Sequence, residues 1–500
     1  MATPSIPTFD VDVPGLDQVF IGGEWRPSDG PMVDVIAPSS EEVVTRVVSP
    51  SIADADAAAE AAGRAFANGA GEWPSMSVEE RVAVCARLCD ALESRMDAMN
   101  RAWTFEAGAP KAHGDMINGG AGVMVWRHAL TMATDEVVWE EDRGDAVIRR
   151  IPTGPVLAIL TYNGPVVLMG MKVIPALLAG CTVVVKHAPE SPLTARLVAE
   201  AVREAGFPEG VVSVVPAGTE VTQHLVSHPA IRMVALTGGT AIGIDVVKRT
   251  ADRLARTALE LGGKAPALLT EDVVVEDVMS TLGVGASGFL GQVCVNLSRI
   301  LVPRSRYDEV VEAMAEHYSS IRVGDPFDPE SDRGPLAVER ARDRSEKYVA
   351  LAQEEGAKVV VGGRRPEHLD RGWYYEPTLL AGADNTMRVA REEIFGPVTS
   401  VIAYDGIDEG IRIANDTPFG LAASVYAADP DEAYAIARRI RSGGVAINMA
   451  GISLTQPFGG IGASGWGREC GAEGILEFTD IQQVLRGGSY LDAADAAAAT

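Results

Sequence analysis

Cysteine is scarce in this chain, and its cysteines and histidines form no cluster. Five cysteines occur among 500 residues, at irregular spacings and without a CxxC motif. The one close pair, Cys85 and Cys89, lies in an alanine-rich helical segment, where two thiols packed on one helix face are expected. These features exclude a disulfide framework and give no support for a zinc site. We therefore predict no bound metal and a reducing, cytoplasmic location.

Basic residues are also few relative to acidic ones. The 69 acidic residues outnumber the 43 basic ones, which gives a formal net charge of −26. Such a surface repels phosphate backbones and anionic lipids, so neither nucleic acid nor a membrane surface is an expected partner. The N-terminus lacks the basic start and apolar core of a signal peptide. A long uncharged run, about residues 151–171, contains three prolines, three glycines and an asparagine, which are unsuited to a membrane helix.

What the sequence does contain is an alternation of β-rich runs and amphipathic helical segments, the pattern of a parallel α/β sheet. A chain of 500 residues is too long for one core, so two or three domains are expected. Ligands of such sheets bind at the carboxyl edge of the strands. The expected strands are 156–162, 181–186, 211–216, 231–237, 266–270, 299–303, 358–363, 400–405, 423–429 and 444–449, with helices over 168–178, 194–206, 220–227 and 276–290.

Four short segments contain groups suited to catalysis or cofactor binding, although each has an ordinary structural alternative. Cys294, in GQVCVNLSR, could equally be a buried structural cysteine. Glu260, in ALELGGKAP, has apolar neighbours that would raise its pKa toward that of a general base, or it could be salt-bridged. Asn163, in LTYNGP, could donate to an oxyanion or simply form a turn. The glycines of LTGGTAIG (236–243) follow an expected strand and precede a helix, which suits a pyrophosphate, but the segment is neither GxGxxG nor a P-loop.

Taken together, these segments resemble the aldehyde dehydrogenase superfamily, and the resemblance extends from about residue 21 to residue 484. LELGGK is similar to the glutamate signature of that family and GQVC to its cysteine signature, and the separation of 34 residues between Glu260 and Cys294 also matches. EEIFGPV, ANDTPFGLAASVY and PFGGIGASGWGRE follow in the family's order. The resemblance implies an aldehyde dehydrogenase-like α/β fold, with two Rossmann-like parallel-sheet domains and a small β oligomerisation element.

The resemblance also implies a role for each matched residue. Cys294 is the expected nucleophile, Glu260 the general base, and Asn163 the oxyanion donor together with the backbone N–H of Cys294. Lys172 and Glu469 match positions that can relay protons from Glu260. The expected NAD(P)+ site comprises Lys186 and Pro189 at the adenosine ribose, Gly238 and Gly239 at the pyrophosphate, and Glu393 and Phe395 at the nicotinamide ribose.

The family pattern also divides the chain into regions. It implies a dinucleotide-binding domain over 1–135 and 152–261, and a catalytic domain over 262–450 that carries the nucleophile. Residues 136–151 are expected to form, with 478–490, an oligomerisation element that extends a sheet between subunits of a homodimer or homotetramer. Residues 491–500 are rich in alanine and are predicted to be a disordered tail.

Two regions depart from the common family pattern. Many NAD-dependent members have a glutamate three residues after the strand-end lysine, where this chain has Pro189 followed by Glu190. Proline has no charge to repel a 2′-phosphate, so we predict that NADP+ is accepted as well as NAD+. Gly164 stands where a bulky aromatic residue is common, and the other expected tunnel positions are also uncharged, namely Leu168, Met171, Ala450 and Phe458. Because a carboxylate would lie unpaired there, we predict a bulky, apolar, uncharged aldehyde as substrate.

Alternatives remain open on the sequence alone. A CoA-acylating aldehyde dehydrogenase would release the acyl group to CoA, but the presence of Glu260 favours water. A catalytically inactive, structural member of the family would not need Cys294, Glu260 and Asn163 together. An alcohol dehydrogenase lacks support because the chain has no zinc cluster. The width of the tunnel can also be unrelated to the natural substrate.

Overall fold

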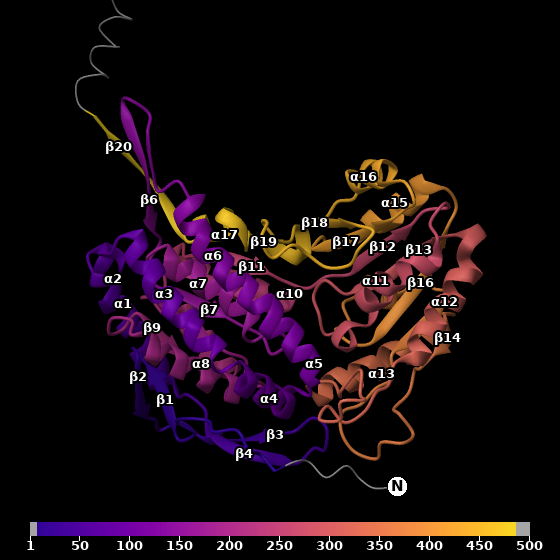
Figure 1. Cartoon of the computed structure of the whole chain (residues 1–500), viewed down its shortest axis with the longest axis horizontal. Coiled ribbons are helices and arrows are strands. Elements are labelled where there is room, and N and C mark those ends of the chain that lie inside the picture. Colours follow the sequence, from indigo (N-terminus) through magenta and orange to yellow (C-terminus); the bar gives the residue numbers. More distant parts are fainter. Residues whose placement is uncertain (1–7, 487–500) are drawn as a thin grey trace, which may run out of the picture.

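Two α/β units, joined by a short segment, make up most of the molecule, and a slender β arm projects from the first unit (Figure 1). The computed structural model describes residues 8–486. An eight-stranded sheet forms the centre of the first unit, and a seven-stranded sheet forms the centre of the second. Within the described residues, no helix is long and apolar enough to cross a membrane. The α/β class with two largely parallel sheets, predicted from the sequence, is confirmed.

The first sheet has the order β19-β11-β10-β7-β8-β9-β1-β2. Its five central strands are parallel, whereas β1, β2 and β19 run antiparallel to their neighbours. The carboxyl ends of the parallel strands therefore meet at one edge, as in other sheets built from βαβ units. The strands are β1 (Gln18–Ile21), β2 (Glu24–Pro27), β7 (Val156–Ile159), β8 (Val183–Lys186), β9 (Val212–Val214), β10 (Met233–Thr237), β11 (Arg256–Glu260) and β19 (Gly465–Trp466).

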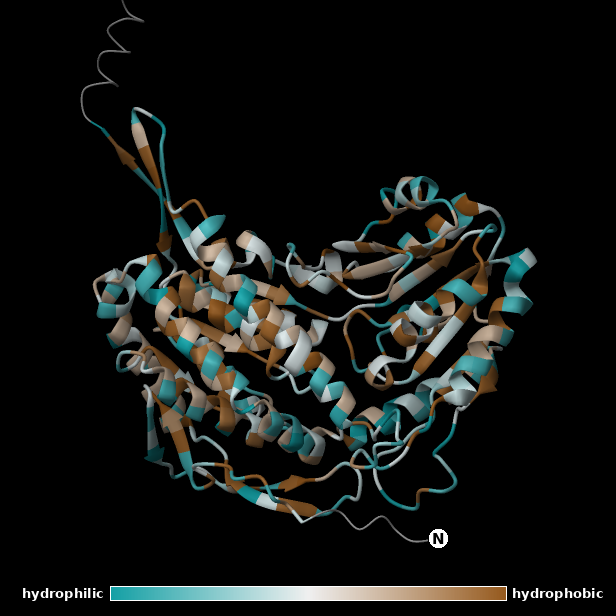
Figure 2. Ribbon diagram, viewed as in Figure 1, coloured by the Kyte–Doolittle hydropathy of each residue, from teal (hydrophilic) through white to brown (hydrophobic). Residues whose placement is uncertain are grey.

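Helices cover both faces of this sheet, because its strands are apolar on both faces (Figure 2). Val156 and Ala158 of β7 pack in a core with α3, α4, α6, α7 and α8, while Leu157 and Ile159 pack in a second core with α1, α9 and α10. The helices are α1 (Ile52–Phe66), α3 (Val78–Glu93), α4 (Met96–Ala107), α6 (Val123–Asp135), α7 (Ile174–Leu178), α8 (Pro192–Ala205), α9 (Thr219–Ser227) and α10 (Thr240–Thr250), with the short α2 (Glu72–Ser75), α5 (Lys111–Gly114) and α17 (Gly471–Leu476) beside them.

The second sheet has the order β14-β15-β16-β13-β12-β17-β18 and is parallel except for β14. It is also buried on both faces. Its strands are β12 (Ala265–Leu269), β13 (Leu297–Pro303), β14 (Lys358–Val361), β15 (Thr378–Ala381), β16 (Val398–Tyr404), β17 (Ala422–Tyr426) and β18 (Gly444–Ile447). Its helices are α11 (Val275–Ser287), α12 (Tyr307–Ser320), α13 (Glu339–Glu354), α14 (Arg388–Arg391), α15 (Ile407–Asn415) and α16 (Pro430–Ala437).

The arm is a three-stranded antiparallel sheet of β5 (Glu140–Asp142), β6 (Ala146–Pro152) and β20 (Thr479–Leu485). A separate two-stranded sheet pairs β3 (Met32–Ile36) with β4 (Val43–Val48). The strand pair expected within 136–151 and the strand expected near 478–490 thus lie in one sheet. The predicted tail, 491–500, lies outside the described residues.

Several elements end earlier than the sequence predicts, and two of these ends lead directly into segments that carry site residues. The strand expected over 156–162 ends at Ile159, where the chain leaves the sheet for the turn that carries Asn163. The helix expected over 276–290 ends at Ser287, and the residues that follow turn with left-handed backbone angles that a right-handed helix does not permit.

Candidate active site

Glu260 is the last residue of β11, at the carboxyl edge of the first sheet. Its side chain is buried, and within the described residues neither carboxylate oxygen has a hydrogen-bond partner. Burial, with a smaller contribution from the negative charge of Glu469, raises the pKa of Glu260 to about 9. A carboxylate in this environment is a stronger base than an ordinary glutamate, and its oxygens are free to accept a proton.

Cys294 follows the left-handed turn after α11 and precedes β13. Its loop rests on the segment 261–264 that joins the two sheets, since a Cβ atom on Gly263 would lie 2.4 Å from the carbonyl oxygen of Cys294. Burial raises the pKa of the Cys294 thiol to about 12, and among nearby charges Glu260 contributes most. The thiol and the Glu260 carboxylate therefore share one water-poor environment.

Asn163 lies in the turn after β7, and its side chain reaches the Cys294 loop. The Asn163 Nδ2 atom donates to the carbonyl oxygen of Gln292 at 3.0 Å, and the Asn163 Oδ1 atom accepts from the Thr161 hydroxyl at 2.6 Å. The first bond fixes which end of the amide faces the loop, because a carbonyl oxygen only accepts whereas a hydroxyl can also donate. Because an amide nitrogen carries two hydrogens, one N–H of Asn163 is left for another acceptor.

Lys172 and Glu469 form a buried ion pair close to Glu260. The Lys172 ammonium donates to the Glu469 carboxylate, and the two side chains are 1% and 7% exposed. The charges of this pair act on the Glu260 carboxyl in opposite directions, because Glu469 raises its pKa and Lys172 lowers it. The structure thus brings together three of the residues singled out in the sequence.

Residues matched to the adenosine ribose and pyrophosphate lie at the carboxyl edge of the first sheet. Lys186 ends β8, and burial lowers the pKa of its ammonium to about 8. Gly238 and Gly239 separate β10 from α10, and a Cβ atom on Gly239 would meet nothing within 4 Å. The first N–H groups of α10 are therefore accessible to an anion such as a pyrophosphate.

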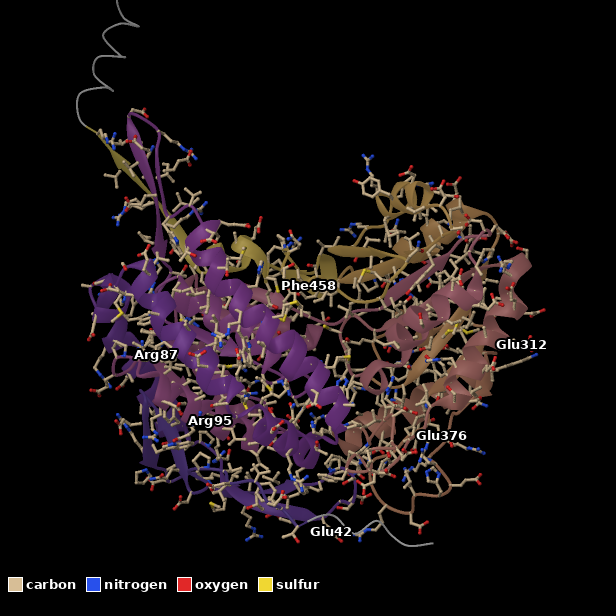
Figure 3. The ribbon with its side chains drawn as sticks, in the orientation of Figure 1. Glu42, Arg87, Arg95, Glu312, Glu376 and Phe458 are labelled. Carbon is tan, nitrogen blue, oxygen red and sulfur yellow. The ribbon has the colours of Figure 1, made fainter. Side chains whose placement is uncertain are left out.

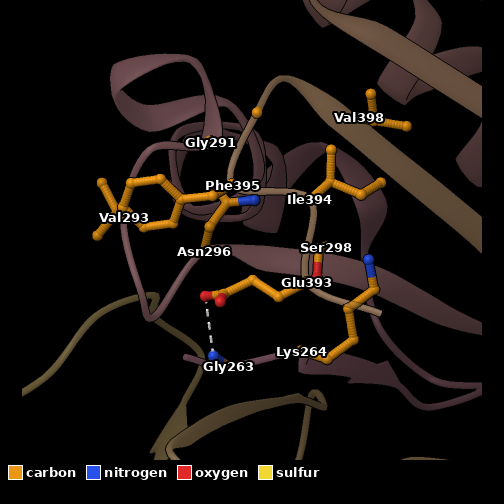
Figure 4. Close-up of a pocket in the computed structure, with 11 residues that line it drawn as sticks. Gly263, Lys264, Gly291, Val293, Asn296, Ser298, Glu393, Ile394, Phe395 and Val398 are labelled. Carbon is orange, nitrogen blue, oxygen red and sulfur yellow. Dashed lines mark hydrogen bonds between the residues drawn. The ribbon is translucent and has the colours of Figure 1, made fainter. Parts of the chain in front are cut away.

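The residues matched to the nicotinamide ribose approach from the second unit. The Glu393 carboxylate accepts a hydrogen bond from the Gly263 backbone N–H at 3.1 Å (Figure 4). Phe395 has a left-handed backbone with φ of 53°. An open helix N-terminus suits a pyrophosphate, a carboxylate accepts from ribose hydroxyls and a lysine donates to them, so these residues fit a nicotinamide cofactor.

Comparisons with known proteins identify the family of this chain. The model of the Aldehyde dehydrogenase family matches residues 25–484. The chain belongs to the aldehyde dehydrogenase family. This makes it an oxidoreductase of the class that acts on aldehydes.

Relatives of this aldehyde dehydrogenase include a geranial dehydrogenase of Castellaniella defragrans, 39% identical over 93% of this chain and 98% of that protein. An aldehyde dehydrogenase of Mycobacterium tuberculosis, solved with NAD+, superposes with a TM-score of 0.92 at 42% identity, covering 95% of this chain and 99% of that chain. A cysteine-to-alanine mutant of aldehyde dehydrogenase C from Pseudomonas syringae, solved with NAD+ and octanal, superposes with a TM-score of 0.91 at 36% identity, covering 95% and 98%.

The expected tunnel residues of this aldehyde dehydrogenase fall into two groups. Leu168, Met171 and Phe458 belong to the same hydrophobic cluster of the first unit, and Cys294 packs against that cluster. Phe458 lies between the two units (Figure 3). A Cβ atom on Gly164 would lie 2.8 Å from Val167 and would also contact Leu168. Ala450 instead packs on the cluster of the second unit.

Some residues that shape this site were not assigned a role from the sequence. Gln292 is fully buried, and its side-chain oxygen accepts from the Ala337 backbone N–H at 3.1 Å and from the Tyr162 hydroxyl at 3.4 Å. Ile452 and Leu454 pack on the same cluster as Leu168. Gln292 could have been singled out because it lies inside the GQVC motif, whereas no motif contains Ile452 or Leu454.

Replacing Gly263 tests whether the Cys294 loop depends on close contact with segment 261–264. We expect Gly263→Ala to displace Cys294 and to lower kcat/KM by about 100-fold, because a shift of about 1 Å in a reacting group can lower the rate by about that factor. Gly288→Ala is the matched control, because it lies just ahead of the same loop and its Cβ atom would meet nothing within 4 Å. Steady-state kinetics with unchanged kcat/KM for Gly263→Ala would contradict the expectation.

Proposed function

We propose that this chain oxidises an aldehyde to its carboxylic acid through a covalent adduct on Cys294. The observation that carries the proposal is the hydrogen bond from the Asn163 amide to the loop of Cys294, with the buried Glu260 close enough to raise the pKa of the thiol. A nucleophile, an oxyanion donor and a base are thereby held together, as acyl chemistry requires.

In the first step, the Cys294 thiol gives up its proton to solvent, and the resulting thiolate attacks the aldehyde carbon. A C–S bond forms, and the electron pair of the C=O π bond moves onto oxygen. The free N–H of Asn163 and the backbone N–H of Cys294 are the donors available to this oxyanion, and one such donor is typically worth roughly 100- to 1000-fold in rate. An aldehyde does not release hydride readily, whereas the resulting alkoxide does.

The second step removes that hydride and leaves a thioester on Cys294. A nicotinamide cofactor, when bound, accepts the hydride. Lys186, Gly238 and Gly239 would hold its adenosine and pyrophosphate, and Glu393 and Phe395 its second ribose. The protein contributes position and a site of low polarity, since Cys294 and Glu393 are both only partly exposed to water.

The third step is hydrolysis of the thioester. Glu260 takes a proton from water, the water oxygen attacks the thioester carbon, and the C–S bond breaks to release the acid and the Cys294 thiolate. The Lys172–Glu469 pair lies where it can pass the proton onward from Glu260. A CoA-acylating enzyme would not need this base, so the retained Glu260 supports water as the acceptor.

The covalent mechanism is tested by two substitutions. Cys294→Ala should abolish aldehyde oxidation. Glu260→Gln should permit one turnover and then stall, because the thioester forms but is not hydrolysed, so rapid-mixing measurements of NADH should show a burst of about one equivalent per Glu260→Gln site.

In the native chain, the rate of thioester hydrolysis should increase from about pH 7 to about pH 9, since a base with a raised pKa acts only when deprotonated.

Two results would contradict this mechanism. Unchanged oxidation by Cys294→Ala would exclude a covalent adduct on that sulfur. Restoration of Glu260→Gln turnover by CoA, with acyl-CoA as the product of the native chain, would favour the acylating alternative over hydrolysis.

The substrate we propose is a bulky, apolar, uncharged aldehyde. Leu168, Met171 and Phe458 are apolar and lie in the cluster against which Cys294 packs. A substrate carboxylate here would lose its hydration without gaining a cation, at a cost of several kcal/mol. Geranial and octanal, named for two relatives of this chain, are aldehydes of the proposed kind.

We further propose that NADP+ is accepted beside NAD+. Pro189 is exposed and carries no charge. The next residue, Glu190, is engaged by Arg340 of α13 at 2.5 Å, which offsets its negative charge. Repulsion of a 2′-phosphate is therefore weak at the position where many relatives carry a glutamate.

An aldehyde panel measured with both cofactors tests substrate and cofactor together. We expect octanal and geranial to give higher kcat/KM than succinic semialdehyde, and NAD+ and NADP+ to differ by less than about 1000-fold. Pro189→Glu should lower kcat/KM for NADP+ by about 10-fold or more while sparing NAD+, because it adds a like charge. Best turnover with succinic semialdehyde would reject the apolar substrate, and a larger preference for NAD+ would reject NADP+ tolerance.

We also propose a separate role for each region of the chain. We assign cofactor binding to 1–135 with 152–261, catalysis to 262–450, and assembly into a homodimer or homotetramer to 136–151 with 478–490. The arm stands away from both units in Figure 1 and leaves Ile481 and Leu485 more than half exposed. Apolar side chains on an edge strand are suited to contact with a second copy.

Charging the arm tests its role in assembly. Ile481→Asp with Leu485→Asp should lower the mass measured by light scattering, because both side chains lie on one face of β20. Leu254→Asp is the control, since Leu254 is exposed elsewhere on the surface. An unchanged mass for the arm variant would remove the arm from the interface.

A further inference from the structure

A small cluster with three aromatic rings lies beside both the Asn163 turn and the Cys294 loop, and its residue Trp103 was given no role from the sequence. Its buried members are Trp103, Ala107, Ala109, Tyr162, Ala188, Phe289 and Ala337. Trp103, on α4, is the largest of them and is fully buried. The cluster thus connects a helix of the first unit with the turns on which the proposed chemistry depends.

Trp103 holds the Asn163 turn through a hydrogen bond. The indole Nε1–H of Trp103 donates to the carbonyl oxygen of Tyr162 at 2.7 Å. Tyr162 immediately precedes Asn163 and lies beyond the end of β7, so its carbonyl has left the sheet. A buried carbonyl needs a donor, and the rigid indole on a long helix supplies one at a fixed place.

The same indole packs against the turn that leads to Cys294. Its ring centroid lies 5.4 Å from that of Phe289, and Phe289 is itself stacked on His113 at 4.6 Å with an interplanar angle of 14°. Phe289 and Leu290 have φ of 43° and 52°, and Gly291 follows with 70°. Two consecutive non-glycine residues in the left-handed region are unfavourable by themselves, so packing must hold them.

We propose that Trp103 is a positioning residue that fixes the Asn163 amide relative to the nucleophile loop. The inference rests on the proposed function, because it concerns the oxyanion of that reaction. Trp103 acts through Tyr162 on one side and through Phe289 on the other. Through these two contacts, Trp103 sets the separation between the Asn163 amide, in the first unit, and the Cys294 loop, in the second unit.

Trp103→Phe separates the hydrogen bond from the ring contact. The variant keeps an aromatic ring against Phe289 but loses the N–H, so the carbonyl of Tyr162 and the Asn163 turn are released. We expect the rate of thioester formation, measured as a single turnover, to fall by about 10-fold with KM for the aldehyde changed less than about 2-fold. Alkylation of Cys294 by iodoacetamide should stay within about 2-fold, because that reaction builds no oxyanion.

Trp139→Phe is the matched control. Its indole also donates to a backbone carbonyl, that of Ala133, at 2.8 Å, but it lies beside β5 at the base of the arm and outside the cluster around Trp103. The control loses the same kind of bond and should retain single-turnover kinetics within about 2-fold of native. Similar thermal midpoints for the two variants, within about 2 °C, would show that the kinetic difference is not a loss of stability.

Trp103→Leu removes both contacts and should therefore alter thiol alkylation as well as thioester formation. If that variant does not fold, Phe289→Leu loosens the same ring contact from the other side and should give the same pair of changes. Thioester formation in Trp103→Phe within about 2-fold of native, or an equal loss in Trp139→Phe, would overturn the proposal. Full oxidation by Cys294→Ala would instead reject the underlying mechanism, which keeps the two failures distinct.

Discussion

The active site depends on the close contact between the Cys294 loop and the glycines that join the two sheets. Only residues 261–264 lie between β11 and β12, so the carboxyl end of one sheet and the beginning of the other are tied together. The carbonyl of Cys294 lies against Gly263, and the carboxylate of Glu393 lies against Gly262 and accepts from the Gly263 N–H. A side chain at either glycine would occupy the space through which Cys294 and Glu393 approach the segment that follows Glu260.

Burial accounts for the electrostatics of this site. The pKa values of Glu260, Cys294 and Glu393 are all raised, and the largest cause in each case is removal from water. A dry site raises the energy of every charged ground state and strengthens each dipole aimed at a developing charge. The Lys172–Glu469 pair places a cation in the same interior, which keeps the number of unpaired negative charges low.

The sequence predicts the residues at strand ends better than the residues that support them. Glu260 and Asn163 lie where strands of a parallel sheet end, and such positions are marked by short motifs with fixed spacing. Trp103 lies about sixty positions before the carbonyl it holds, and nothing in a helical pattern distinguishes it from other core residues. The left-handed turn after Ser287 is also invisible to periodicity, because it is stabilised by tertiary packing around Phe289.

The proposed tunnel residues and the Cys294 loop share one hydrophobic core, but only the Cys294 loop also rests on the glycine segment between the sheets. Leu168, Met171 and Phe458 are part of the large helix-covered core of the first unit, whereas the reactive groups rest on the glycine segment between the sheets. Changes of volume in a packed core are absorbed over many neighbours, while a shift in segment 261–264 moves nucleophile and base together. Under the proposed function, substitutions at Leu168, Met171 or Phe458 would therefore change the tunnel wall with little effect on the contact between Cys294 and Gly263.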